Sequence, residues 1–582
     1  MIGDGKRTML RAGLLAGGAV SLMLSASLTP AHAAGSSAPV LLRDSLAGSD
    51  ATIGLPGVHW QPYERNSTVE PSIAVDPANP LDAVASYHSG RDPNGASADL
   101  GYATTTDGGH TWVHGNLPGL TTHVDPAAPF NHASDPVVAF GPDHIVYVSS
   151  LVTVEDGSGS VSAGGLAVNV SKDGGVTWEA KPVFMHMDDP ALINDVGVFD
   201  DKNWIVVDDS SAPGHHLGRV YVIWDIQLLS LYAYCDPDRA GAATQGCDQA
   251  SNWTTSATDA ATTYANSGFY LLRQNSIGSV PIVLQSGSLF DVFNDEGNAP
   301  VCLTSVTCNL AGFSEVVAPG AGAVVWPAPL PFAANPVQIA SDDSNAVRLQ
   351  RAGTNLPSAA MDPVTGRVAI AWAGGRFRSD GVNDLEVAVS TDPAGSVWSS
   401  PIRVGAPGAS TTDYLDSYDP MIGWGSDGSL QVAYRQRQEA ADPSQMSQVI
   451  DTYFQQSTDQ GATWSAPLKV DTQATDVGYC AFSRGGCFEG DYSEIAPASN
   501  GNTYIVREEA YASYPGEPVN NSGTTFNNDN GHINQHAWVA VVGPQPTANT
   551  PETPLTAGLA LAGLGAGAVA LGVRRRRRVE IA

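Results

Sequence analysis

The chain has 582 residues and a formal net charge of −31, from 28 lysine and arginine residues against 59 aspartate and glutamate residues. Such an acidic chain repels polyanions, which excludes DNA and RNA as partners. We expect an anionic ligand to bind only where basic residues are locally concentrated.

Residues 1–33 have the features of a secretory signal peptide. Three basic residues precede an apolar stretch at 12–28, and Ala31-His32-Ala33 supplies a small-residue cleavage site. We therefore expect cleavage before Ala34 and a secreted chain. A retained membrane helix is the alternative.

Six similar units follow the N-terminal segment at 34–62. Each unit has a short apolar strand, a turn and a stronger apolar strand, and long helical periodicity is rare, which predicts an all-β ectodomain. The six units begin at Glu70, Asp135, Asp201, Pro357, Asp419 and Asp491.

Four shorter segments repeat Ser or Thr, Asp, Gly and Trp in near-constant register. They lie at residues 105–112, 171–178, 390–398 and 457–464. The Asp carboxylate accepts backbone N–H bonds across a hairpin turn, the glycine adopts positive φ, and the tryptophan packs beneath the turn. The segments resemble the Asp-box, or bacterial neuraminidase repeat, of sialidase-like β-propellers.

The units and the resemblance together predict a six-bladed β-propeller over residues 63–543. Residues 536–542 are expected to end blade six and close the ring, or residues 34–62 supply the closing strand. Blade three contains a long insertion at about 228–345. That insertion is interpreted as a lid, a small extra domain or a decorated loop.

Six cysteines fall into three close pairs, which favours local disulfides in an extracellular chain. The pairs are Cys235 with Cys247, Cys302 with Cys308, and Cys480 with Cys487. The sequence alone does not fix this connectivity. A metal site is disfavoured because the Cys-x2-Cys spacing is absent.

The C-terminus resembles a bacterial cell-surface anchor. A Pro/Thr linker at 544–554 leads into an uncharged apolar segment at 555–573 and a basic tail at 574–582. An apolar segment of this length just spans a bilayer, with the arginines on the cytoplasmic side. The sortase pentapeptide is absent, so membrane retention and wall attachment both remain open. We expect an anchored, extracellular monomer.

The predicted inner strands begin with acidic or amide residues that a propeller would gather at one end of its channel. These residues are Glu70, Asp135, Asp201, Asn355, Asp419 and Asp491. They predict a cation or polyol site, or simply strand caps. No cofactor is expected; Asp188-Asp189 and residues 291–298 are candidates for structural Ca²⁺, without EF-hand spacing.

The sialidase resemblance implies a tyrosine nucleophile, an Asp acid/base and arginines that bind the substrate carboxylate. By position, Tyr492 matches the nucleophile and Asp92 the acid/base. Arg376 and Arg435 match two clamp arginines, and Arg91 is a substitute for the third.

Two features depart from that pattern. The Arg-Ile-Pro motif of blade one is missing, because four residues separate Arg65 from the Glu70-Pro71 dipeptide. Asn355 stands where a glutamate would polarise the tyrosine, whose reference pKa of about 10 makes it a poor nucleophile. Glu386 or Glu439 is expected to replace that glutamate if the fold brings it close.

Three functions remain open at this stage. The first is an extracellular sialidase-like glycoside hydrolase that acts on the terminal sugars of glycans. The second is a non-catalytic propeller that binds a glycan or a protein at the cell surface. The third is a hydrolase for neutral sugars that uses two carboxylates of the channel.

Overall fold

The computed structural model describes most of the predicted ectodomain. The described residues are 38–55, 63–156, 160–187, 200–226, 229–237, 246–253, 270–274, 276–295, 309–315, 337–341, 343–347, 350–353, 356–405, 408–438, 449–483, 486–512 and 533–545. The predicted signal peptide and the apolar C-terminal segment lie outside them, as do Cys302, Cys308, Asn355, Glu439 and the Asp188-Asp189 pair. Among the described residues, no helix is long and apolar enough to cross a membrane.

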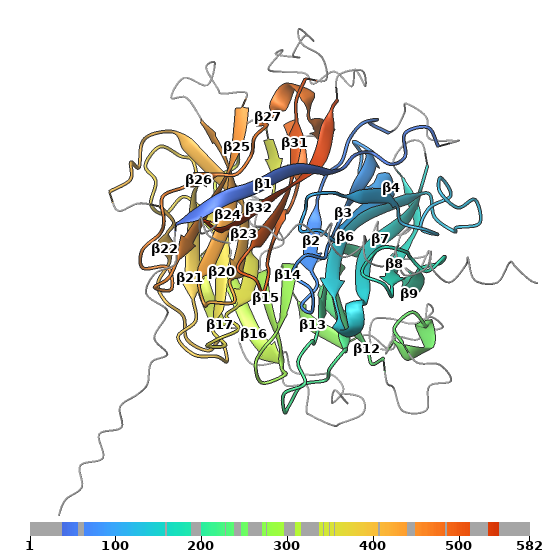
Figure 1. Cartoon of the computed structure of the whole chain (residues 1–582), viewed down its shortest axis with the longest axis horizontal. Helices are drawn as coiled ribbons and strands as arrows, with labels where there is room; N and C mark the ends of the chain where they lie inside the picture. The colour runs from blue at the N-terminus through green and yellow to red at the C-terminus, as the bar shows by residue number, and fades with distance from the viewer. Residues whose placement is uncertain are drawn as a thin grey trace, which may run out of the picture. The chain divides into compact units, whose positions relative to one another are not determined.

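The described strands form seven successive units of four antiparallel strands (Figure 1). The first unit contains β2 (Ser72–Val75), β3 (Ala83–Arg91), β4 (Ser97–Thr105) and β5 (Val113–Asn116). The second contains β6 (His132–Phe140), β7 (Val146–Glu155), β8 (Val161–Ser171) and β9 (Val183–Met187). The third contains β10 (Asp200–Val207), β11 (Val220–Ile226), β12 (Leu229–Cys235) and β13 (Tyr270–Gln274). The next two are β14 (Ser276–Val283), β15 (Leu289–Asp295), β16 (Asn309–Glu315), β17 (Val337–Ser341); and β19 (Ser358–Met361), β20 (Val368–Gly374), β21 (Asp384–Val389), β22 (Ile402–Arg403).

The last two units are β23 (Leu415–Trp424), β24 (Leu430–Gln438), β25 (Val449–Ser457), β26 (Leu468–Lys469); and β30 (Glu494–Pro497), β31 (Thr503–Ala510), β32 (Gln535–Pro544), β1 (Pro39–Gly48). The short β27 (Thr475–Asp476) also pairs with β25. A smaller sheet contains β18 (Gln350–Ala352), β29 (Gly486–Gly490) and β28 (Ala481–Ser483). In the part of the chain that the structure describes, three 3₁₀ helices lie in connections, at Pro142–His144, Ala250–Asn252 and Val477–Tyr479.

The seven units follow one another around a ring. The first strands contact each other in the order β2, β6, β10, β14, β19, β23 and β30, and β30 returns to contact β2. A separate cluster of buried apolar side chains lies between each adjacent pair of units. This cyclic order is that of a β-propeller.

The predicted count of six blades is not confirmed. Residues predicted to be an insertion in blade three instead supply β12 and β13, which complete the third unit, and all of β14–β17. Sequence reasoning missed this unit because its inner strand contains Gly278 and Pro281 and no Asp-box follows it.

The two ends of the described chain meet in the seventh unit. Strand β1 pairs antiparallel with β32, from Pro39 opposite Pro544 to Gly48 opposite Ala537 (Figure 1). Both predicted closing segments therefore contribute, with residues 536–542 inside β32 and part of 34–62 in β1. Pairing the first strand with the last stabilises a ring against opening because it leaves that sheet complete.

Four inner strands carry a bulge near their first residues. Register shifts occur in β6, β10, β14 and β23, next to Asp135, Lys202, Gly278 and Asp419. All four residues have φ between 45° and 73°, and Glu70, just before β2, has φ of 52°. A bulge re-aims side chains and is common beside functional sites. Here it groups polar side chains at one end of the channel.

The Asp-box turns form as predicted. Asp107 accepts the N–H groups of His110 and Thr111 at 3.0 and 2.9 Å, and the Thr111 hydroxyl at 2.7 Å. Asp173 and Asp459 accept the matching threonine bonds. The looser segment differs, because Asp392 accepts N–H bonds from Ala394, Ser396 and Val397. The carboxylates thus bind their own turns.

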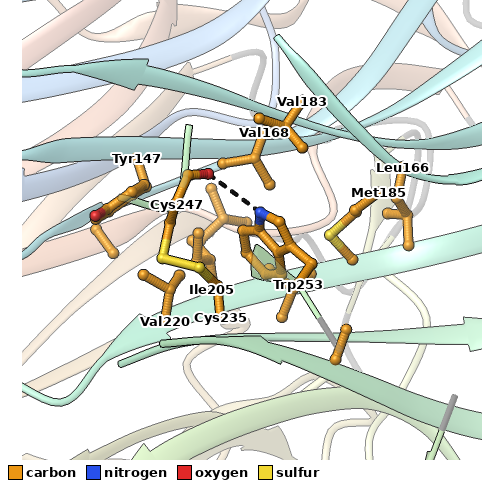
Figure 2. Packing of buried hydrophobic residues seen from close by; sticks show 14 of the residues in the cluster. Tyr147, Leu166, Val168, Val183, Met185, Ile205, Val220, Cys235, Cys247 and Trp253 are labelled. Carbon is orange, nitrogen blue, oxygen red and sulfur yellow. Dashed lines mark hydrogen bonds between the residues drawn. A yellow bond between two sulfur atoms is a disulfide. The ribbon is translucent and has the colours of Figure 1, made fainter. Parts of the chain in front are cut away.

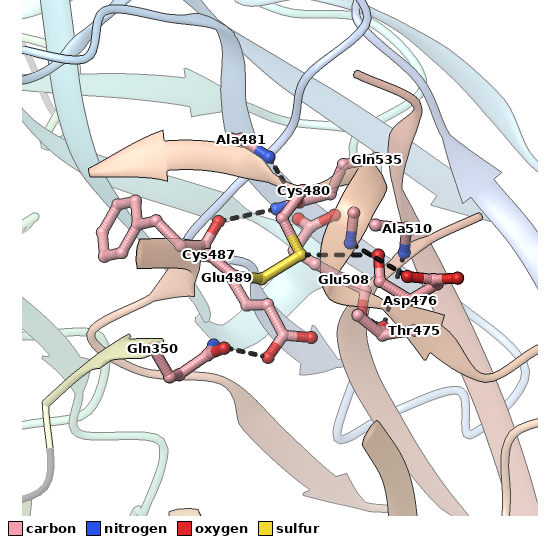
Figure 3. The surroundings of a disulfide bond; sticks show 12 residues. Gln350, Thr475, Asp476, Cys480, Ala481, Cys487, Glu489, Glu508, Ala510 and Gln535 are labelled. Carbon is pink, nitrogen blue, oxygen red and sulfur yellow. Dashed lines mark hydrogen bonds between the residues drawn. A yellow bond between two sulfur atoms is a disulfide. The ribbon is translucent and has the colours of Figure 1, made fainter. Parts of the chain in front are cut away.

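Two of the predicted disulfides are present, which is consistent with an extracellular chain. Cys235–Cys247 packs beside Trp253, whose indole N–H donates to the Cys247 carbonyl at 3.1 Å (Figure 2). Cys480–Cys487 closes the β28–β29 hairpin (Figure 3). The third predicted pair lies outside the described residues.

Candidate functional site

The predicted carboxylates gather at the channel end where the inner strands begin, and we call this region the channel mouth. Its members are Glu70, Asp135, Asp201, Asp419 and Asp491, together with Lys202, Arg351 and Tyr492. The backbone N–H of Asp491 donates to Glu70 Oε1 at 3.3 Å, which joins the first and seventh units. Ser493 donates to Asp419 Oδ2 at 2.6 Å.

Lys202 supplies a buried positive charge within this acidic group. The residue is 6% exposed, and its Nζ lies 3.9 Å from the ring centroid of Tyr492 and 4.6 Å from that of Trp204. Among the described residues this ammonium has no hydrogen-bond partner. Its charge lowers the pKa of Asp135 and Asp491 relative to burial alone.

Asp491 and Asp201 are the more accessible carboxylates of the mouth. Asp491 is ion-paired with Arg351 at 2.6 Å, in side chains that are 21% and 41% exposed. Burial raises the pKa of Asp491 to about 6, although Arg351 opposes that shift. The Asp201 side chain is exposed at the surface, but its carboxylate is poorly solvated because protein surrounds it at slightly larger distances. This desolvation first, and then repulsion by Asp135, Asp225 and Asp491, raises the pKa of Asp201 to about 7.

Glu70 is shifted in the opposite direction. Its carboxylate lies 2.9 Å from His88 Nε2, and both side chains are buried. Burial by itself raises the pKa of Glu70, but His88, Arg351 and Arg91 outweigh burial and lower it to about 2. The mouth therefore holds one carboxylate that is ionised at all ordinary pH values beside two that titrate near neutrality.

Tyr492, the predicted nucleophile, is buried in the mouth. Its hydroxyl donates to the Pro136 carbonyl at 3.1 Å, and its ring meets the edge of Trp204. Burial, followed by Glu70 and Asp135, raises its pKa well above 10. A phenol in this environment stays protonated, so the nucleophilic role remains a prediction that requires local rearrangement.

The predicted clamp arginines already have protein partners. Arg376 lies 3.2 Å from Asp343 and 3.9 Å from Glu386. Arg435 is buried and bonds to Glu489, to the Glu508 carbonyl at 2.8 Å and to two threonine hydroxyls. Each guanidinium is thus engaged before any ligand arrives.

Arg91 is the last residue of β3, and Asp92 begins the loop that follows. Arg91 Nη1 donates to the carbonyls of Asp92 and Ala96, and its guanidinium stacks 4.9 Å from the ring centroid of Phe488. Asp92 Oδ2 lies 3.2 Å from His132 Nε2. The predicted acid/base is therefore grouped with a histidine.

Glu386, the predicted partner of the tyrosine, contacts Arg376. Its Oε1 accepts the backbone N–H of Arg376 at 3.2 Å, and its Oε2 has no hydrogen-bond donor among the described residues. Burial, then Asp343, raises its pKa to about 8. The structure brings Glu386 and Arg376 together, as it does Arg91 and Asp92; the catalytic and binding roles of all four stay predictions.

The β28–β29 hairpin contributes a residue that sequence reasoning missed. Its glutamate, Glu489, accepts a bond from Gln350 at 2.8 Å (Figure 3). Glu489 also accepts a bond from Tyr418 at 3.1 Å and pairs with Arg435. The parallel pairing of β18 with β29 brings Arg351 to Asp491.

Four residues in or beside the channel mouth carried weak or no signal in the sequence: Lys202, Arg351, His88 and Glu489. Lys202 was the most recognisable, since it follows a predicted channel aspartate directly. The positions of His88, Arg351 and Glu489 depend on strand pairing over long sequence separations, which short-range patterns do not report.

Two cavities lie along the inner strands. One of about 270 Å³ is lined by Trp204, Ser358, Trp424 and Glu494. The other, of about 730 Å³, is lined by residues near the ends of β10, β14 and β19, including Asp208, His215 and Gln285. Both cavities are lined in part by Pro281 and Ala359–Met361, so they lie next to each other.

No protein-family model and no curated protein matches this chain. Among solved structures, an α-L-arabinanase of Penicillium chrysogenum is 10% identical, covering 86% of this chain and 98% of its own, with a TM-score of 0.35. The α-L-arabinofuranosidase of Fusarium graminearum is 12% identical, covering 88% and 98%, with a TM-score of 0.36. Trypanosoma rangeli sialidase is 11% identical, covering 69% and 54%, with a TM-score of 0.33. Similarities at this level carry no argument about what this chain does.

Proposed function

We propose that this chain is an extracellular glycoside hydrolase that acts on uncharged terminal sugars at the channel mouth. The observation that carries the proposal is the pair of accessible carboxylates, Asp491 with its pKa at about 6 and Asp201 with its pKa at about 7. Glycosidases need one protonated and one ionised carboxyl group at the same pH.

The charged groups around Asp491 and Asp201 determine the catalytic role that we propose for each. Arg351, 2.6 Å from Asp491, favours the ionised form of that side chain, which suits a nucleophile or general base. Repulsion from three other aspartates favours the protonated form of Asp201, which suits a general acid. Lys202 and the aromatic rings of Trp204 and Tyr492 offer a donor and apolar faces beside the pair.

The engaged arginines favour a neutral substrate. A sialic acid carboxylate would have to displace protein acceptors from Arg91, Arg376 and Arg435, two of which are buried. A neutral sugar needs hydroxyl contacts alone, and the carboxylates accept such bonds. Sialidase chemistry, with Tyr492, Asp92, Glu386 and these arginines in the predicted roles, is the alternative under test.

The test is hydrolysis of a panel of aryl glycosides, neutral ones beside a sialoside. We expect turnover of a neutral glycoside, with kcat lower by about 10²–10⁴-fold in Asp201→Asn and in Asp491→Asn. The pH dependence should be a narrow bell, rising as Asp491 ionises and falling as Asp201 loses its proton. Tyr492→Phe should retain most activity.

Asp143→Asn is the matched control, because Asp143 is exposed in the turn between β6 and β7 and should leave kcat unchanged. Turnover of the sialoside alone, abolished by Tyr492→Phe, would establish the sialidase alternative instead. Binding of glycans without turnover of any member of the panel would replace the hydrolase with a binding propeller.

A further inference from the structure

We infer that Asp92, His132 and Glu155 form a binding site for one divalent transition-metal ion, outside the proposed catalytic pair. One oxygen of each carboxylate and one nitrogen of the imidazole lie within 4.8 Å of one another. The three side chains are 2%, 3% and 6% exposed respectively. The inference does not depend on the proposed hydrolase activity.

The three donor atoms converge on one point. His132 Nε2 lies 3.2 Å from Asp92 Oδ2 and 4.0 Å from Glu155 Oε2. Tetrahedral zinc with ligand bonds of about 2.0–2.2 Å separates its ligands by roughly 3.3 Å, so Glu155 Oε2 would have to move about 0.7 Å closer to His132 Nε2 on binding. The residues come from the loop after β3, the start of β6 and the end of β7, which are all well packed.

Hydrogen bonds outside the group fix each ligand. Asp92 Oδ1 accepts the Asn94 N–H at 2.9 Å, which leaves Oδ2 for the site. Glu155 Oε1 accepts the Thr153 hydroxyl at 2.9 Å. The other oxygen, Glu155 Oε2, faces His132 Nε2 at 4.0 Å, which is beyond hydrogen-bond distance, in a side chain that is 6% exposed.

Asn131 sets the histidine tautomer. Its amide donates to the Glu155 carbonyl at 2.8 Å, and its Oδ1 accepts the Glu155 N–H at 2.9 Å, so the orientation of the amide is fixed. The same Oδ1 lies 3.0 Å from His132 Nδ1 and accepts a hydrogen bond from its N–H. With Nδ1 carrying this hydrogen, a metal ion would be bound through Nε2, as in other metal-binding histidines.

Charge balance favours a cation over a simple ion pair. An imidazolium has one N–H at Nε2, which can serve Asp92 but leaves Glu155 Oε2 unbonded. A divalent ion would bind one oxygen of each carboxylate and the imidazole nitrogen at once, and would offset the charge of both carboxylates. The nearest guanidinium, that of Arg91, directs Nη1 to backbone carbonyls. Mixed imidazole and carboxylate donors suit Zn²⁺ among the divalent ions.

The test is calorimetric titration of the chelator-treated full chain with Zn²⁺ alone, at pH 7. We expect one equivalent to bind with a Kd of about 1 µM or tighter. His132→Ala and Glu155→Gln should each weaken binding at least about tenfold, and Asn131→Ala should weaken it by about 10–100-fold through the tautomer. Zn²⁺ should raise the unfolding temperature of the wild type more than that of these three variants.

His114→Ala is the matched control, because His114 is exposed on β5 and should leave the affinity unchanged. A wild-type chain that binds no Zn²⁺ below about 100 µM overturns the inference, whatever the variants do. Wild-type affinity in both His132→Ala and Glu155→Gln also overturns it. Glu155→Gln keeps the volume and the threonine bond, so it tests the ligand without removing the fold.

Discussion

Lys202 is the residue on which the charge balance of the channel mouth depends. Five carboxylates, those of Asp135, Asp225, Asp419, Asp491 and Glu494, are stabilised in their ionised form by its ammonium. The positive φ of 45° at Lys202 places its side chain between Trp204 and Tyr492. A single bulge in β10 thus determines the electrostatics of several blades.

Replacing this ammonium is expected to destabilise the fold. Lys202→Met should lower the free energy of unfolding by about 3 kcal/mol at pH 8, because buried carboxylates lose their counter-charge. The loss should be smaller at pH 5, where Asp225, Asp491 and Glu494 are largely protonated. Urea unfolding at both pH values measures the difference.

Lys181→Met is the control for that variant, since Lys181 is exposed and should change stability by no more than about 0.5 kcal/mol. Equal effects of Lys202→Met at pH 5 and pH 8 would contradict the electrostatic explanation and leave only lost packing.

At the scale of elements, the Asp-box turns show what a short motif contributes. Burial raises the pKa of Asp107, but hydrogen bonds from Thr111, Thr105 and His110 outweigh it, so the pKa lies below its ordinary value. The pKa of this carboxyl group is near 4 in the unfolded chain and lower in the folded chain, so its ionised form stabilises the fold above about pH 4. This stabilisation is lost as the pH falls through the pKa of the folded state.

Removing that carboxylate should weaken the β4–β5 turn. Asp107→Ala is expected to cost about 1–2 kcal/mol of unfolding free energy at pH 7, because two backbone N–H groups and two threonine hydroxyls lose their acceptor. Asp107→Asn keeps one acceptor oxygen and should cost less. Thermal unfolding of both variants checks the order, and the reverse order would contradict the hydrogen-bond account.

The closing strand makes a close approach that only glycine allows. A Cβ added at Gly48 in β1 would lie 1.8 Å from Tyr87 Oη, in a side chain that is fully buried. Gly48→Ala should therefore cost about 2 kcal/mol through overpacking, measured by urea unfolding. Leu46→Ala, two residues away and exposed, is the control; an equal cost there would mean that strand pairing rather than the contact is affected.

For the whole molecule, buried carboxyl groups determine how stability varies with pH. Burial raises the pKa of Asp99, Glu64 and Glu508 to about 8, and that of Asp225 and Glu494 to about 7. Each of these groups ionises near pH 4 when the chain is unfolded. Ionisation therefore favours the unfolded chain increasingly between pH 4 and 8, so stability should fall over that range.

We expect the unfolding temperature to decrease by several degrees from pH 5 to pH 8, measured by calorimetry with a chelator present to exclude metal effects. Below about pH 4 the trend should reverse, because protonation of Glu70 removes its favourable interaction with His88. An unfolding temperature that rises from pH 5 to pH 8 would contradict the assigned shifts.

The sequence by itself determined features that depend on neighbouring residues. The all-β class, the Asp-box turns and two local disulfides follow from short-range patterns, because a turn hydrogen bond or a close cysteine pair needs only nearby residues. The inner-strand carboxylates were also predicted, since each begins a strand that the pattern identified.

Only the tertiary structure decided the number of units, the closing pair β1–β32 and the partners of the charged side chains. The unit β14–β17 lacks an Asp-box, so it became visible only through its strand pairing. The sequence predicted that Arg435 binds the substrate carboxylate, but Arg435 instead bonds to Glu489, which lies 54 residues further along the chain. Such pairings arise when the ring closes, because closure brings distant segments into a space where unpaired charges are costly.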